Sequence, residues 1–324
     1  MKKRHLRGIC FGFLFCLICV SINSSWSAEA KFPSRPIEIY IGFEAGGQTD
    51  LMVRALAKAL EKHLGVTVVP INKPGGGGVV ANTALINSRP DGYTMANTAA
   101  INIVSPLVLG QATYTLQDLR VIGQYSIAPN VISVSADSPW KTFREFLDYE
   151  KKNPGVKYGH PGIGSGPYLM MENLKRKAGL KMVGVPFKGD PEVLSAVLGN
   201  HVSVAVGSLY SAKVQEEGGK MRILFSFEPT AKAGLGPSIP DMEALFGKSV
   251  AESHIPVIRM LIAPGKTPNE IIQVLEQALE KTTKDREFIS AMDKFHIMTE
   301  FAAGNTIMQK LPVIMSAVKE ILKP

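Results

Sequence analysis

The sequence predicts an α/β protein built from two lobes, each with a sheet covered by helices on both faces. Strand and helix signals alternate along the chain beyond residue 31, which is typical of βαβ units and indicates parallel sheets. The alternation forms two series, and each contains a glycine-rich turn between a strand and a helix, at residues 42–50 and 159–166. The length of 324 residues suits a leader and two ordinary domains.

The N-terminal 30 residues are typical of a cleaved secretory signal peptide. Four basic residues precede a short apolar stretch, 9–20, and Ala28-Glu29-Ala30 supplies the small residues of a cleavage site. An uncleaved anchor stays open as the alternative, although the stretch is short for a membrane span. The three cysteines, Cys10, Cys16 and Cys19, all fall in this leader. We therefore expect an exported mature protein without disulfides, thiolate metal sites or thiol nucleophiles.

The first series begins with an apolar strand, 37–41, that leads into the first glycine turn. Thr49 is expected to cap the next helix, 49–64, which carries apolar residues at helical spacing and ends at Gly65. A strand at 66–69 would complete a βαβ unit. A helix at 79–87 and a strand at 93–96 are expected after two further glycine-containing turns.

The second series and the C-terminal part follow the same alternation. Its expected elements are strand 131–134, helix 142–152, strand 156–158, helix 168–177, helix 190–199, strand 202–206 and strand 257–263. Asp190 is expected to cap its helix ahead of Pro191, and Thr267 with Glu270 forms a capping-box pattern. The terminal helix, 306–322, is expected to be kinked or interrupted at Pro312.

Both glycine turns lie where a strand ends and a helix begins, and the first N–H groups of a helix have no partner within it. Such turns readily bind anions, and open α/β sheets bind ligands at the carboxyl ends of their strands. Residues 43–50 would serve in one lobe and 160–165 in the other. This arrangement suggests a clamshell receptor that closes on a carboxylate. An ordinary strand-to-helix turn is the alternative for the first segment.

Motifs for other chemistries are incomplete. Gly265-Lys266-Thr267 resembles part of a P-loop but lacks its upstream glycine, and Ser165 has the wrong spacing for a nucleophile elbow. The histidines beyond the leader form no metal-spaced pair, and no long basic tract indicates nucleic-acid binding. We expect no catalytic residue, metal or cofactor. The alternative is an exported hydrolase or isomerase that uses His160 and Ser165.

Seven short segments, in order across nearly the whole mature chain, match motifs that occur together in one family. They are residues 43–50 (PFxAGGxTD), 72–78 (NRPGAGG), 90–95 (PDGYTL), 158–164 (YGSxGxG), 185–189 (VPYKG), 219–222 (GKLR) and 263–268 (APAGTP). Each match alone is weak. Together they make the chain similar to the Bug-type solute-binding receptors of tripartite tricarboxylate transporters.

The resemblance implies a two-domain periplasmic binding protein, a type II-like clamshell joined by two crossing strands. Domain 1 would combine residues 31–130 with 256–324, and domain 2 would hold residues 131–255. The resemblance also implies a monomeric receptor that captures a small organic carboxylate in the periplasm and delivers it to membrane permease subunits.

Family members commonly hold one carboxylate through water molecules at the two glycine turns. Carried over by position, the expected ligand-binding residues are Phe43, Ala45, Gly46, Thr49, Asp50, Asn97, Thr98, His160, Gly164, Ser165 and Ser208.

Four positions depart from the family pattern. His160 replaces a serine, and Tyr168 replaces the usual histidine. Glu44 would favour a ligand carrying an amine if it faced the pocket, and would have no role if it faced solvent. Arg259 stands in an apolar strand where the family often has an aromatic residue, so it either meets a ligand carboxylate or pairs internally. The identity of the carboxylate, and transport as against signalling, stay open.

Overall fold

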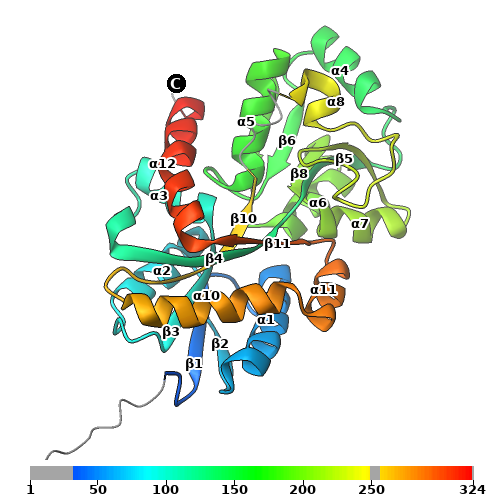
Figure 1. Ribbon diagram of the computed structural model, residues 1–324. Coiled ribbons are helices and arrows are strands. Elements are labelled where there is room, and N and C mark those ends of the chain that lie inside the picture. The colour runs from blue at the N-terminus through cyan, green and yellow to red at the C-terminus, as the bar shows by residue number, and fades with distance from the viewer. Residues whose placement is uncertain (1–31, 249–255, 323–324) are drawn as a thin grey trace, which may run out of the picture.

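The computed structural model describes residues 32–248 and 256–322. The predicted leader, its cysteines and His254 lie outside these residues. The described chain forms two lobes, each containing one sheet with helices on both faces (Figure 1). The α/β clamshell predicted from the sequence is confirmed. No helix of the described residues is both long and apolar enough to cross a membrane.

The first lobe contains a six-stranded mixed sheet in the order β11-β4-β10-β3-β1-β2. Its strands are β1 (Ile37–Ile41), β2 (Val68–Asn72), β3 (Thr94–Ala99), β4 (Leu119–Ile127), β10 (Ile258–Pro264) and β11 (Met298–Ala303). β1 pairs in parallel with β2 and β3, as the predicted βαβ unit requires. β10 runs antiparallel to both β3 and β4, and β11 runs antiparallel to β4, so the sheet is not parallel throughout.

Two helical layers cover this sheet. One core holds buried residues of α1 (Gln48–Leu64), α10 (Asn269–Thr283) and α11 (Arg286–Asp293). The other face carries α2 (Val79–Ile86), α3 (Ala100–Val108) and α12 (Gly304–Ile321). Short 3-10 turns, η1 (Gly76–Gly78) and η2 (Leu116–Asp118), lie in the connections. Leu261 packs in the α1 core and its neighbours Met260 and Ile262 in the α3 core, as strand alternation requires.

The second lobe contains a five-stranded sheet in the order β7-β6-β8-β5-β9. Its strands are β5 (Asn130–Ser135), β6 (Lys157–His160), β7 (Val183–Pro186), β8 (Val204–Ser208) and β9 (Met221–Ser226). One face packs against α4 (Phe143–Lys152), α5 (Gly166–Ala178) and α8 (Met242–Phe246). The other face packs against α6 (Asp190–Leu198) and α7 (Leu209–Glu217).

Two crossing segments join the lobes. β4 of the first sheet leads through Ala128 and Pro129 into β5 of the second, and the chain returns through Val257 into β10 (Figure 1). The two segments touch, because the Ala128 N–H donates to the Val257 carbonyl at 3.1 Å. β10 therefore begins where the lobes meet.

The helices lie close to their expected positions, but three predicted caps are wrong. Gly47, Gly189 and Pro268 occupy the N-cap positions of α1, α6 and α10 without side-chain capping bonds. Thr49 lies two residues beyond the N-cap of α1 and Asp190 one residue beyond that of α6, and both bond elsewhere, as described below. Thr267 Oγ1 is buried without a partner among the described residues.

Of the two outcomes expected at Pro312, a kink or an interruption, the interruption is wrong. α12 continues through Pro312, which stands in a helix anchored by the buried residues Ile307, Leu311 and Ile314. Packing of this apolar face outweighs the backbone hydrogen bond that proline removes.

Candidate functional site

The first glycine turn leaves β1 at a point of close backbone contact. A Cβ atom placed on Gly42 would lie 2.6 Å from the Gly78 Cα atom, so this position admits only glycine without displacement. Beyond it Phe43 is half-buried, whereas Glu44, Ala45 and Gly46 are exposed. The solvent-facing interpretation of Glu44 agrees with its exposure.

Asp50 holds the first turn in place. One carboxylate oxygen accepts from the Gly46 N–H and from Arg54 Nε, each at 2.9 Å, and the other accepts from Asn72 Nδ2 at 2.9 Å. Burial alone would raise the pKa of Asp50, but these hydrogen bonds outweigh it and hold the pKa below its usual value. Asp50 thus positions the turn, and the Gly46 N–H is already used within the protein.

Arg259 reaches the first turn from β10. Its Nη1 donates to Thr49 Oγ1 at 3.4 Å, and its buried Nε has no hydrogen-bond partner among the described residues. Desolvation lowers the pKa of Arg259, while the negative charge of Asp190 in the second lobe opposes that shift. No carboxylate of the described chain lies in ion-pair contact with this guanidinium.

Asn97 lies beside the first turn in the middle of the sheet. It pairs with Ile41, the last residue of β1, and with Leu261 of β10. The Tyr125 hydroxyl donates to Asn97 Oδ1, whereas the buried Asn97 Nδ2 has no partner among the described residues. Asn97 and Thr98 are both 2 % exposed. Asn97 therefore presents an unpaired donor close to the carboxyl end of β1.

The second glycine turn packs against the first lobe. Gly164 has φ +81, and a Cβ there would lie 2.9 Å from Leu109 Cδ1, next to the end of α3. Ser165 caps α5, where its hydroxyl oxygen accepts from the Tyr168 N–H at 3.4 Å. A Cβ on Gly166 would lie 2.6 Å from Val257 Cγ2, so this turn touches the segment that leads into β10.

His160 is placed under α5. It is 1 % exposed, and its ring lies between those of Tyr158 and Tyr168, with centroids 5.6 and 4.7 Å away. Burial lowers the pKa of His160, so neutral pH favours the uncharged imidazole. Its Nδ1 is buried without a partner, and Ser165 bonds to the α5 backbone. The described side chains thus show no His160–Ser165 hydrogen bond of the kind a hydrolase would use.

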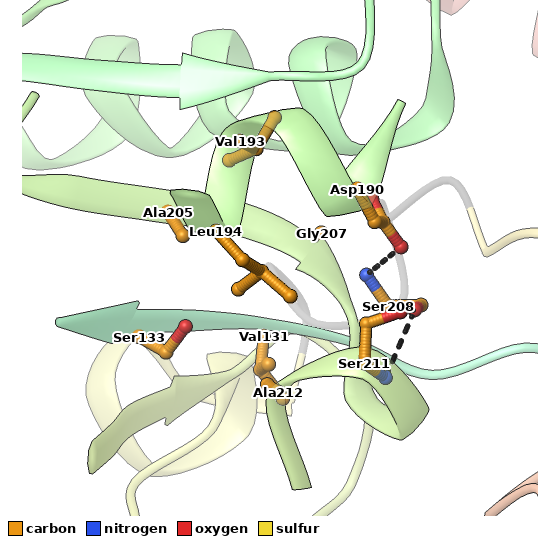
Figure 2. A pocket seen from close by; sticks show the side chains of 10 residues that line it. All are labelled: Val131, Ser133, Asp190, Val193, Leu194, Ala205, Gly207, Ser208, Ser211 and Ala212. Carbon is orange, nitrogen blue, oxygen red and sulfur yellow. Dashed lines mark hydrogen bonds between the residues drawn. The ribbon is translucent and has the colours of Figure 1, made fainter. Parts of the chain in front are cut away.

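Ser208 lies at the start of α7, beside Asp190 (Figure 2). Its N–H donates to Asp190 Oδ2 at 3.1 Å, and its hydroxyl bonds to Ser211 Oγ at 2.9 Å. Ser208 and Asp190 line a small hollow between α6, α7 and the sheet, together with Val131, Leu194 and neighbouring side chains. Asp190, read from the sequence as a helix cap, instead bonds to the end of β8.

The two turns therefore meet the same crossing segment. Thr49 of the first turn contacts Arg259, and Gly166 at the second turn faces Val257. Val257 and Arg259 are two residues apart, which is about 7 Å along an extended chain. Sequence reasoning did not include Arg259 or Asp190 in the site, and it missed Tyr125 because β4 has no continuous apolar run. Among the described residues no group of three or more potential His, Cys, Asp or Glu ligands could hold a metal ion.

The arrangement of two α/β lobes around crossing strands defines the chain as a bilobed solute-binding protein. A profile described as "tripartite tricarboxylate transporter family receptor" matches residues 52–315. The chain belongs to this family of periplasmic solute-binding receptors.

Individual relatives agree with this assignment. The "UPF0065 protein in gbd 5'region" of Cupriavidus necator is 36 % identical over 267 residues, covering 82 % of this chain and 80 % of the relative. A TctC solute-binding protein from Polaromonas is 27 % identical with a TM-score of 0.71, covering 90 % and 99 % of the two chains. A protein of R. palustris solved with adipate has a TM-score of 0.79 at 21 % identity, covering 90 % and 97 %, which is a likeness of fold.

Proposed function

We propose that this protein is an exported periplasmic receptor that captures a small organic carboxylate between its lobes and delivers it to the membrane permease of a tripartite tricarboxylate-type transporter. The signal peptide would be cleaved after residue 30. The proposed domains are residues 31–130 with 256–324 and residues 131–255, and the proposed working form is a monomer without cofactor or catalytic activity.

One observation carries the proposal: two helix-opening turns from different lobes approach the same segment, Val257 to Arg259. A solute held there would contact both lobes, and its binding would favour the closed arrangement. Arg259 and the start of α1 each contribute positive potential where the turns meet. A carboxylate is therefore the favoured ligand, and the neighbour solved with adipate lends support at the level of fold.

The enzyme alternative has less support. His160 is almost completely buried, and its nearest ring partners are tyrosines rather than Ser165. A general base must reach the proton that it removes, directly or through one water. Isothermal titration of the mature protein with succinate, malate, adipate and benzoate, beside a turnover assay on each, tests the choice. We expect saturable binding without product, and product formation would overturn the receptor proposal.

The turn hydroxyls provide a direct test of the site. Thr49→Val and Ser165→Ala should each weaken carboxylate binding by ~1–3 kcal/mol, because each removes a hydrogen bond to a charged group. Titration calorimetry measures the loss, and Thr115→Val, in the exposed turn before β4, is the control. If both site variants bind like the unaltered protein, these turns do not form the site.

A further inference from the structure

Arg259 is a charged side chain at the lobe junction whose bonds within the protein do not account for its position. A guanidinium carries five N–H donors in a planar fork that matches a carboxylate. Arg259 uses one nitrogen in a long, 3.4 Å bond to a neutral hydroxyl, and its Nε is buried without a partner. Removing such a charge from water is costly unless an anion and hydrogen bonds compensate.

Arg120 shows what an internally satisfied arginine looks like in the same sheet. Both arginines are partly buried on neighbouring strands. Arg120 Nη1 donates to the Thr267 carbonyl at 2.9 Å and to Asn269 Oδ1 at 2.7 Å. Arg259 has no equivalent acceptors among the described residues, which leaves most of its guanidinium donors free of them for an external anion.

The donors around Arg259 converge from three elements. Thr49 stands in the first turn of α1, and Asn97, 2 % exposed, carries an unpaired Nδ2 on the neighbouring strand β3. Sheet pairing sets Asn97 opposite Leu261, two positions from Arg259 on the same face of the sheet. The main chain offers fewer free N–H donors for a ligand than the two glycine turns suggest. The Gly46 N–H donates to Asp50, and Pro167 has no N–H at the start of α5.

We propose that Arg259 is a specificity-determining residue that directly binds an ionised carboxylate of the ligand, with Thr49 and Asn97 completing the same subsite. This inference rests on the proposed receptor function and deepens it: the carboxylate is held by a guanidinium and not by main-chain amides and water alone. Neutral amides and cationic solutes bind poorly at this position. Asp190 in the second lobe does not contact the arginine, and its negative charge competes with the ligand carboxylate for it.

An internal role gives a different expectation for Asp190. If Arg259 served to hold the lobes together through Asp190, loss of either charge would weaken closure and ligand binding alike. If Arg259 serves the ligand, Asp190→Asn should raise the affinity for an anion, because it removes a competing negative charge near the subsite. Asparagine retains an oxygen that can accept the Ser208 N–H, so this variant is structurally mild.

The experiment is titration calorimetry with adipate, succinate and their diamides on the mature protein and four variants. Arg259→Met should weaken dicarboxylate binding roughly 10- to 150-fold, as expected for lost hydrogen bonds to a charged group, and should change diamide binding much less. Arg259→Lys should recover part of the affinity, because it keeps the charge without the fork. Arg120→Met, the matched control, should bind dicarboxylates like the unaltered protein. Chemical denaturation of each variant identifies any that does not fold.

The outcomes separate the two proposals. If the unaltered protein binds dicarboxylates and Arg259→Met binds them equally tightly, the role of Arg259 is refuted and the receptor proposal is left intact. Equal losses for adipate and adipamide, or a loss in Asp190→Asn as large as that in Arg259→Met, would also refute it. Absence of carboxylate binding by the unaltered protein would instead contradict the receptor proposal itself.

Discussion

Asp50, one of the expected site residues, shows how hydrogen bonds within the protein fix the first glycine turn. Its carboxylate accepts from the turn at Gly46, from Arg54 on the next helical turn, and from Asn72 at the end of β2. Three elements are thereby fixed around one buried group. The motif resemblance pointed to Asp50 as a ligand-binding residue, a prediction that stays untested. The structure adds the three donors that bond to its carboxylate, which a single sequence does not reveal.

Asp50→Asn should lower the free energy of unfolding by ~1–3 kcal/mol at neutral pH, because it removes charge-assisted hydrogen bonds. The pKa of Asp50 is depressed in the folded state, so its contribution is present above the ordinary aspartate pKa of about 3.9. The contribution is lost as the pH falls through the folded-state pKa. Urea denaturation at neutral pH and at about pH 3 should therefore show the difference between variant and parent shrinking on acidification. Asp137→Asn, at an exposed position, is the control and should leave the free energy of unfolding nearly unchanged at neutral pH.

Among the elements, those with strong local signals were predictable and those defined by partners were not. β1 coincides with its predicted range, and α1, α4 and α6 differ from theirs by one residue or so. β4 was missed because Gly123, Gln124 and Ser126 interrupt its apolar pattern; those positions are buried by β10 and β11 on either side. Its strand character comes from pairing, which local propensity does not record.

The first turn depends on a contact between elements that lie far apart in the sequence. Gly42, directly after β1, lies against the backbone of Gly78 at the start of α2. Gly42→Ala should cost ~1–3 kcal/mol of stability, because a methyl group would overlap a main-chain atom that cannot rotate away. It should also weaken carboxylate binding by displacing the turn.

Gly47→Ala is the matched control for this substitution. Gly47 lies in the same turn with φ −76. A Cβ added there would lie 3.5 Å from its nearest neighbour, the Glu44 carbonyl oxygen, which is an ordinary contact. Thermal and urea denaturation should show a much smaller loss for Gly47→Ala than for Gly42→Ala. Equal losses would mean that the close approach at Gly78 is not what restricts position 42.

At the level of the whole molecule, the alternation of strands and helices predicted two lobes, and the motif order predicted their solute-binding arrangement. The location of the lobe contacts could not be predicted in this way. α5 meets α12 through the exposed ion pair of Arg176 and Glu320, while Tyr210 of α7 meets Phe295, which lies between α11 and β11. These contacts join residues more than 80 positions apart, which neither periodicity nor a short motif can connect.

Tyr210 and Phe295 join the lobes on the side of α7 and α11 (Figure 1). Their rings pack edge to face with centroids 5.5 Å apart. If this contact forms when the lobes close on a ligand, Tyr210→Ala should weaken adipate binding by about 0.5–1.5 kcal/mol, the value of such an aromatic pair. The loss arises because a ligand binding across two lobes must supply the free energy of closure. Titration calorimetry measures it, and small-angle scattering should show a smaller ligand-induced contraction.

Tyr149→Ala separates closure from general destabilisation. Tyr149 packs on Trp140 with centroids 5.0 Å apart, and both residues lie in the second lobe. This variant should lose stability on denaturation while keeping the affinity of the unaltered protein, because it removes a comparable ring contact that does not change between open and closed arrangements. An equal loss of affinity in the two variants would show that Tyr210 acts on folding stability, and unchanged affinity in Tyr210→Ala would exclude its contact from the closed, ligand-bound arrangement.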